Sequence, residues 1–263
     1  LIEMFCNFEV YAELFKITRN YGVNPLDVII LFIKQSKKDK ELKKFWEYLM
    51  TPELTKRIFT SIVLIGIFLF CFFIHAYFFY VFIIIVSFIS LIELNNIFKK
   101  IKLKKSLKNI NVFLSSIYLS FFAFIVSYGY HQKNLLIFLL LVCIFSDIGG
   151  YIIGKIVRGR KLTKISPNKT ISGSIGSFLF STIPLFIFNI YDTNQYPIGI
   201  LIFLLCLTVS LACQIGDLFI SYLKRKAKVK DTGNILPGHG GFLDRIDGII
   251  LAVPIGIVGI IIF

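Results

Sequence analysis

The longest uncharged stretch of the chain runs from Ile58 to Ile92 without a single Lys, Arg, Asp or Glu. As one helix it would be about 52 Å long at about 1.5 Å per residue, whereas the hydrocarbon core of a bilayer is roughly 30 Å thick. The stretch therefore predicts two membrane-spanning helices joined by a tight turn near His75. A soluble domain of this length could not bury so much apolar surface, because 56% of the chain is hydrophobic and average usage is about 45–50%.

Five further apolar segments follow, each close to the roughly 20 residues that a spanning helix needs. They lie at about 111–128, 134–154, 174–191, 197–223 and 247–263. The predicted fold class is therefore an all-α polytopic transmembrane protein with about seven spans. This composition excludes collagen, a disordered chain and a disulfide-rich secreted scaffold.

The basic residues test this count of spans. Of the 29 Lys and Arg residues, all but Lys133 fall before the first span or in the loops 95–110, 155–173 and 224–246. Basic residues collect on the cytoplasmic side of a membrane protein. We therefore expect the N-terminus and these loops to face the cytosol from a bacterial-type inner (cytoplasmic) membrane, with the C-terminus on the other side.

Residues 1–55 differ from the remainder of the chain. They carry mixed charge, and segments 5–19 and 26–50 show amphipathic helical patterns that are too polar or too short to span a bilayer. We interpret 1–55 as a cytosolic extension of unknown role and 56–263 as the membrane-embedded domain.

Two carboxylates, Asp147 and Asp217, lie inside predicted spans, each about two helical turns from the predicted cytosolic end. A carboxylate at that depth is costly and marks a candidate functional site, although a polar contact between helices is the alternative. Asp217, Ser221 and Lys224 follow one another at i, i+4 and i+7, so they share one helical face.

The loop that follows is rich in glycine and carboxylates. Three glycines surround His239 in the segment 237–241, and exposed backbone amides in such a loop can bind an anion. Asp244 and Asp247 lie at i and i+3 at the start of the last span, where they can share a hard cation such as Mg²⁺.

A second loop, Ser166–Thr170, contains two hydroxyls, an amide and a cation in five residues. It precedes a Gly-containing helix start, where free backbone N–H groups favour phosphate, although Ser-Pro-Asn is also turn chemistry. Together, the two loops bring carboxylates, cations and flexible backbone to one side of the membrane. That set is typical of phosphoryl or nucleotidyl transfer.

The segment Ser221–Asp247 resembles the C-terminal signature of the phosphatidate cytidylyltransferase (CDP-diacylglycerol synthase) family. That signature reads Ser-x-apolar-Lys-Arg-x4-Lys-Asp, a small residue, then Pro-x-His-Gly-Gly-apolar-x-Asp-Arg-apolar-Asp, and every fixed position is satisfied here. Asp147 with Gly149–Tyr151, and the loop Ser166–Thr170, are similar to a second region of the family. One departure is Ile171-Ser172-Gly173, where members usually have Trp-Glu-Gly.

The resemblance implies transfer of the cytidylyl group of CTP to phosphatidate, which gives CDP-diacylglycerol and pyrophosphate in phospholipid biosynthesis. It implies a Mg²⁺ requirement, with a second, monovalent cation such as K⁺ beside the first metal. Metals and cationic side chains would neutralise two anionic reactants while a phosphate oxygen of phosphatidate attacks CTP. The expected partners are CTP and phosphatidate within the bilayer, with no nucleic acid and a homodimer as one possible assembly.

Nine residues are expected to carry catalysis. The expected metal ligands are four aspartates, of which the second is also a candidate for ordering the loop: Asp217, Asp231, Asp244 and Asp247. The expected phosphate contacts are donors around them: Lys224, Arg225, Lys230, His239 and Arg245. The expected substrate-binding side chains are Asp147, Ser166, Asn168, Lys169 and Ser221.

Two alternatives stay open at this point. A CTP-dependent polyprenol or lipid-alcohol kinase would share the nucleotide and the membrane setting. An ion-coupled transporter could use Asp147 and Asp217 as coupling-ion sites, but it predicts acids near the midplane and an inverted repeat, and the sequence shows neither. A CDP-alcohol phosphatidyltransferase is excluded because its motif needs further acids, and none follows Asp247.

Overall fold

The computed structural model describes residues 52–102, 104–163, 165–166, 169–191, 199–238 and 240–262. Contacts divide the chain into two units, Leu1–Ile65 and Gly66–Phe263, and apart from the first part of α5 the features discussed below belong to the second. The predicted extension 1–55 lies almost wholly outside the described residues. The described part is helical and has no strand, only the isolated bridges Lys161–Thr170 and Leu236–Gly240.

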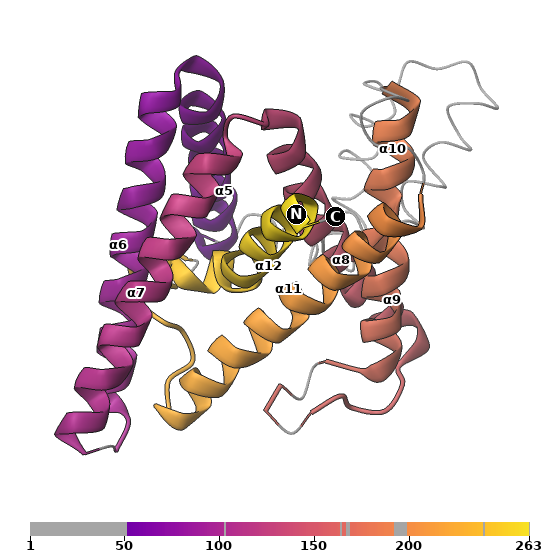
Figure 1. Ribbon diagram of the computed structural model, residues 1–263. Coiled ribbons are helices and arrows are strands. Elements are labelled where there is room, and N and C mark those ends of the chain that lie inside the picture. The colour runs from indigo at the N-terminus through magenta and orange to yellow at the C-terminus, as the bar shows by residue number, and fades with distance from the viewer. Residues whose placement is uncertain are drawn as a thin grey trace, which may run out of the picture. The chain divides into compact units, whose positions relative to one another are not determined.

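Eight helices make up the described chain (Figure 1). They are α5 (Pro52–Ile74), α6 (Ala76–Lys100), α7 (Lys105–Gly129), α8 (Lys133–Val157), α9 (Ile171–Ser181), α10 (Ile183–Tyr191), α11 (Ile200–Lys226) and α12 (Leu243–Ile262). Six stretches in the described residues are long and apolar enough to cross a membrane: Lys56–Ile74, Ala76–Lys100, Lys105–Gly129, Lys133–Val157, Ile171–Phe188 and Ile200–Lys226. This confirms the all-α polytopic class. The seventh predicted span corresponds to α12, which is not among the six and begins with three charged residues in its first five.

The predicted break in the first apolar stretch is confirmed at His75, between α5 and α6. His75 has extended backbone angles, and its Nδ1 accepts a hydrogen bond from the Tyr77 N–H at 3.2 Å. A side chain that satisfies a free amide at a helix start stabilises that start. His75 therefore ends one helix and caps the next without a loop.

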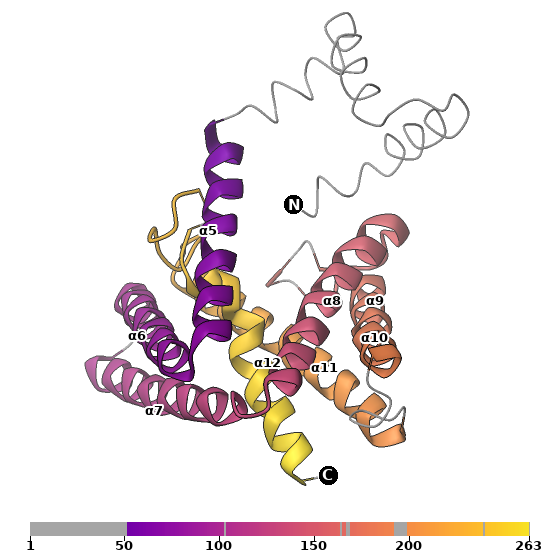
Figure 2. The ribbon, with the colours of Figure 1, turned by 90° about the horizontal axis from the view of Figure 1, so that it is seen from above.

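Helix α12 packs against α6, α7, α8 and α11, and Figure 2 shows it between them. Pro254 lies inside α12 and has no N–H to give to the carbonyl of Ile250, four residues earlier. The Tyr118 hydroxyl of α7 donates to that carbonyl at 2.9 Å. An interhelical hydrogen bond thus replaces the helical one that Pro254 removes, and it links α7 to the helix that carries Asp244 and Asp247.

Small residues let the helices around the site approach closely. A Cβ atom on Gly149 of α8 would lie 2.4 Å from the backbone oxygen of Gly176 in α9. A Cβ atom on Gly216 of α11 would lie 2.6 Å from the backbone oxygen of Asp247 in α12. Close backbone packing of this kind is typical of membrane helices. Because Gly216 precedes Asp217, this packing brings Asp217 next to the turn that holds Asp247.

Candidate active site

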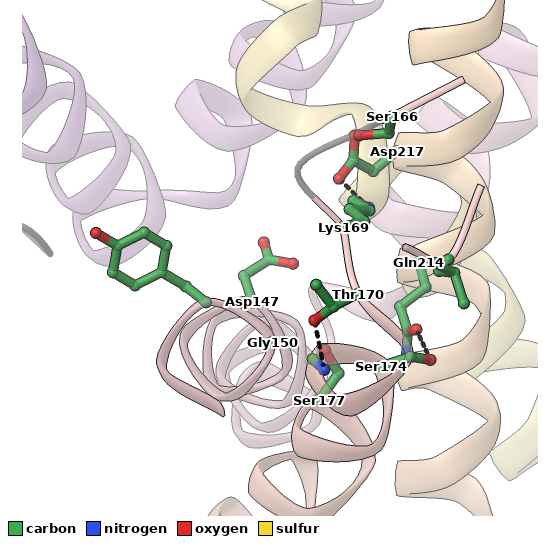
Figure 3. A pocket seen from close by; sticks show the side chains of 12 residues that line it. Asp147, Gly150, Ser166, Lys169, Thr170, Ser174, Ser177, Gln214 and Asp217 are labelled. Atoms are coloured by element: carbon green, nitrogen blue, oxygen red, sulfur yellow. Dashed lines mark hydrogen bonds and ion pairs between the residues drawn. The ribbon is translucent and has the colours of Figure 1, made fainter. Parts of the chain in front are cut away.

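A cavity of about 330 Å³ opens between α8, the loop 158–170, the start of α9 and α11. Ligand sites commonly occupy about 300–1,000 Å³. Figure 3 shows side chains from these segments facing the cavity. The lining residues are Asp147, Gly150, Tyr151, Leu162, Ser166, Lys169, Thr170, Gly173, Ser174, Ser177, Gln214 and Asp217. Four of the predicted site residues therefore line one cavity: Asp147, Ser166, Lys169 and Asp217.

The ion pair between Lys169 and Asp217 joins the loop to α11 (Figure 3). The loop folds back on itself, since the Leu162 N–H donates to the Lys169 carbonyl at 2.8 Å, beside the bridge between Lys161 and Thr170. This pairing fixes the backbone of Lys169. The two paired side chains keep 28% and 31% of their surface exposed, so a ligand in the cavity can reach both.

The first turn of α9 forms another wall of the cavity. The Thr170 hydroxyl caps α9 by accepting from the Gly173 N–H at 3.0 Å. Ser172, which stands where members of the family usually have Glu, accepts from the Gly159 N–H at 3.2 Å. This departure therefore ties the loop after α8 to the start of α9. A helix N-terminus facing a cavity favours an anionic group there.

Gln214 of α11 is a lining residue to which the sequence analysis assigned no role. Its Oε1 accepts from the Ser174 hydroxyl at 2.5 Å, and its Nε2 donates to the Ser210 hydroxyl at 3.4 Å. Ser210 in turn shares a 2.8 Å hydrogen bond with the buried Ser146 of α8. The amide is thus held by one hydroxyl of the neighbouring helix α9 and by one hydroxyl of its own helix, which in turn bonds to α8. A glutamine among apolar residues, three positions before an intramembrane aspartate, was the signal available in the sequence.

Lys224, in the last turn of α11, and Asp244, in the first turn of α12, form a second cluster outside the cavity lining. Their ion pair measures 2.7 Å, with 16% and 6% of the side chains exposed. Oδ2 of Asp244 also accepts from the Thr232 N–H at 2.8 Å and the Gly241 N–H at 3.2 Å. Burial acts to raise the pKa of Asp244, but the Lys224 ammonium and these two amides outweigh it and hold that pKa below its ordinary value. Asp244 therefore carries a negative charge that the protein itself balances.

Asp147, Asp217 and Asp247 come from three helices and lie close enough to interact electrostatically. Asp247 also lies within the field of Lys224 and accepts from the Gly248 N–H at 2.9 Å. In the part of the chain that the structure describes, no three His, Cys, Asp or Glu side chains are close enough to enclose a metal ion. The four-aspartate metal site stays a prediction.

The remaining predicted residues fall into three groups. The Ser221 hydroxyl donates to Oδ1 of Asp217 at 3.3 Å, as the shared helical face predicts. Arg225 Nε donates to the Ile165 carbonyl at 3.4 Å, which links the end of α11 to the loop 158–170. Three predicted residues are exposed, on the loop 229–242 or in the first turn of α12: Lys230, Asp231 and Arg245. Two predicted residues lie outside the described residues: Asn168 and His239.

Comparison with known proteins identifies the family. A Rickettsia bellii protein named phosphatidate cytidylyltransferase is 47% identical over 130 residues, which are 47% of this chain and 56% of the relative. The Bacillus subtilis protein of the same name is 46% identical over 121 residues, covering 45% of this chain and 44% of the relative. That of Helicobacter pylori is 41% identical over 132 residues, covering 49% and 48%. The chain thus spans about half the length of the curated relatives it matches. The model of the cytidylyltransferase family matches residues 102–263, well over half of the chain, and the chain therefore belongs to that family, as its sequence motifs indicate.

Proposed function

We propose that this protein transfers the cytidylyl group of CTP to phosphatidate, giving CDP-diacylglycerol and pyrophosphate. One observation carries the proposal. A single cavity combines anion donors, namely Lys169 and the first turn of α9, with the two carboxylates Asp147 and Asp217. The relatives named phosphatidate cytidylyltransferase support the same reaction.

The anion donors would bind the triphosphate of CTP. Lys169 supplies a full positive charge, and the α9 amides and the hydroxyls of Ser166 and Ser174 supply neutral donors around it. Preorganised donors of this kind stabilise charge that develops at phosphate oxygens without reorganising during the reaction. Lys169 is paired with Asp217, so the bound triphosphate of CTP would replace Asp217 as the partner of Lys169.

The carboxylates fit the chemistry of Mg²⁺. That ion is usually bound by one or two carboxylates together with substrate phosphates rather than by a complete protein cage. Asp217 and Asp247, held together by the close approach of Gly216 to α12, are the pair we propose to hold it. Metal binding by Asp231 and Asp244, and a neighbouring monovalent cation, stay predictions made from the sequence. When bound, Mg²⁺ would neutralise the charge on the departing pyrophosphate.

Phosphatidate would reach the cavity from the bilayer. Leu211, Ile215 and Phe219 are exposed and recur every four residues along α11, so they form an apolar stripe. Asp217 lies two residues from both Ile215 and Phe219, about 200° around the helix axis, so the stripe occupies the face of α11 away from Asp217. We propose that this stripe packs against the acyl chains of the bilayer, from which phosphatidate would come.

We further propose that the site faces the cytosol of a bacterial-type inner membrane, because the basic loops flank it. A Lys228→Cys variant, made in a chain whose five native cysteines are replaced by serine, tests this orientation. A membrane-impermeant maleimide should label inside-out vesicles and spare right-side-out vesicles, and the reverse pattern would refute the orientation.

Radiolabelled CTP tests the reaction. The full chain in mixed micelles receives Mg²⁺, phosphatidate and either α-³²P-CTP or γ-³²P-CTP, with a lipid alcohol as the alternative acceptor. We expect α label in the lipid product and γ label in pyrophosphate. Transfer of γ label to the lipid alcohol would establish a kinase instead. The Asp217→Asn variant, prepared in the same way, is the control for contaminating activity.

A further inference from the structure

Glu93 of α6 is a buried carboxylate that no sequence motif or family match covers. Its side chain is 1% exposed, and it precedes residues 102–263 of the family match. A buried carboxylate is costly unless hydrogen bonds compensate it. The hydrogen-bond donors to Glu93 show which parts of the chain this carboxylate holds together.

Three hydrogen bonds reach Glu93 from one distant segment of the chain. The Thr232 hydroxyl donates to Oε2 at 2.6 Å, the Leu243 N–H donates to Oε2 at 2.9 Å, and the Phe242 N–H donates to Oε1 at 2.9 Å. These partners lie 139 to 150 residues away in sequence. Two of the three donors are amides at or next to the start of α12, where free N–H groups need acceptors. Glu93 thus fixes both the loop 229–242 and the first turn of α12.

Thr232 connects Glu93 to the candidate active site. The Thr232 hydroxyl also lies 3.1 Å from Oδ2 of Asp244, and the Thr232 N–H donates to the same oxygen at 2.8 Å. The other oxygen of Asp244 holds the Lys224 ammonium. A continuous chain of contacts therefore runs from Glu93 through Thr232 and Asp244 to Lys224.

The packing around Glu93 leaves little room for an alternative arrangement. A Cβ atom on Gly241 would lie 1.9 Å from the Thr232 hydroxyl and 2.6 Å from Oε2 of Glu93. The loop backbone therefore closes directly over the carboxylate. A carboxylate enclosed in this way has one set of partners, so it can hold the loop in one conformation.

We propose that Glu93 is a positioning residue, which acts through Thr232 to hold Asp244 and Lys224 in place for the phosphates of the substrate. The expected effect on kcat rests on the proposed function, whereas the expected effect on the order of the loop 229–242 does not. Residues that orient carboxylates at metal or phosphate sites contribute about 10- to 100-fold to affinity or activity.

The test compares two variants that break the chain of contacts with two that spare it. Glu93→Gln keeps the shape but exchanges one acceptor oxygen for a donor, and Thr232→Val keeps the shape but removes the hydroxyl. Thr232→Ser retains the hydroxyl. Ser90→Ala changes a buried residue one turn earlier on α6. The Ser90 hydroxyl donates to the Val86 carbonyl of the same helix at 2.8 Å. Each full-length variant is examined by amide hydrogen exchange, by thermal unfolding and by CTP turnover.

We expect Glu93→Gln and Thr232→Val to speed amide exchange across residues 229–243 and to lower kcat by about 10- to 100-fold. Thr232→Ser and Ser90→Ala should change neither. In a Lys224→Met background, Glu93→Gln should lower kcat by less than about threefold further, because residues that act as one unit are not additive. If Glu93→Gln fails to fold, Thr232→Val and Thr232→Ser decide the question.

Three results would overturn the inference: unchanged exchange in the loop, full additivity with Lys224→Met, or equal losses in Thr232→Val and Thr232→Ser. A wild-type protein without CTP turnover would refute the proposed function instead. The exchange comparison would then still decide whether Glu93 holds the loop.

Discussion

The hydrogen bond between Tyr118 and the Ile250 carbonyl gives a prediction whose size follows from the geometry. Pro254 leaves that carbonyl without its helical donor, and the Tyr118 hydroxyl supplies one at 2.9 Å. Tyr118→Phe removes the donor and keeps the ring. Interhelical hydrogen bonds in membranes average about 0.6 kcal/mol and reach about 1.7 kcal/mol. We expect about 1–1.5 kcal/mol here, in the upper part of that range, because the stranded carbonyl belongs to the buried Ile250 and an unsatisfied buried group adds its own cost.

Pro254→Ala provides the decisive background, because alanine restores the N–H that can bond the Ile250 carbonyl within α12. In that background, Tyr118→Phe should cost less than about 0.5 kcal/mol, so the double-mutant cycle should give a coupling of about 1 kcal/mol. The assay is reversible unfolding in mixed micelles, followed by loss of helical circular dichroism. Tyr128→Phe on the same helix is the matched control, since 57% of Tyr128 is exposed, and it should be neutral. Equal losses from Tyr118→Phe in both backgrounds would refute the reasoning.

Three further predictions concern the candidate active site. Lys169→Met should lower kcat/KM for CTP by about 10²-fold or more, as removal of a preorganised donor does. The free energy of unfolding should change by less than about 1 kcal/mol, because the ion pair with Asp217 is partly exposed. Kinetics and thermal unfolding of the same preparation test the two effects. Asp217→Asn and Asp247→Asn should each abolish CTP turnover while the protein remains in the membrane fraction. Chelation with EDTA should abolish turnover by the wild type until Mg²⁺ is returned. Near-normal turnover by either variant would remove that residue from the proposed metal site. Ser174→Ala removes a hydroxyl that we propose donates to the triphosphate, and it should raise the KM for CTP more than it lowers kcat. An effect confined to kcat would show that Ser174 does not bind the nucleotide.

The sequence predicted those features that depend on local physics. An uncharged run too long for one crossing requires a break, and His75 provides it by capping α6. The depth of Asp147 and Asp217 marked both as candidate site residues, and both line the cavity. The i, i+4 spacing placed the Ser221 hydroxyl beside Asp217, and the structure shows that contact.

The features that the sequence did not predict depend on contacts between distant segments. Glu93 was visible as one of the few acids after residue 58, but nothing in its neighbourhood indicates a partner 139 residues away. The pairing of Lys224 with Asp244 was equally hidden, because the spacing on α11 relates Lys224 only to residues of its own helix. Helical periodicity specifies which residues share a face of one helix. Contacts between residues on either side of a loop depend on the conformation of that loop and on how the two helices pack.

The two ion pairs differ in a way that bears on the proposed binding of two anionic substrates. Lys169 pairs with Asp217 in the cavity, and Lys224 pairs with Asp244 next to the loop 229–242. The first pair is about a third exposed on each side, whereas Asp244 is nearly buried and also holds two backbone amides. Separating the second pair would leave a buried charge uncompensated, which costs more than separating an exposed pair. Substrate binding should therefore exchange the partners of Lys169 and Asp217 and leave Lys224 and Asp244 together as a fixed support. This division of roles is the reason that a residue as remote as Glu93 can matter for the chemistry: it secures the pair that must not move.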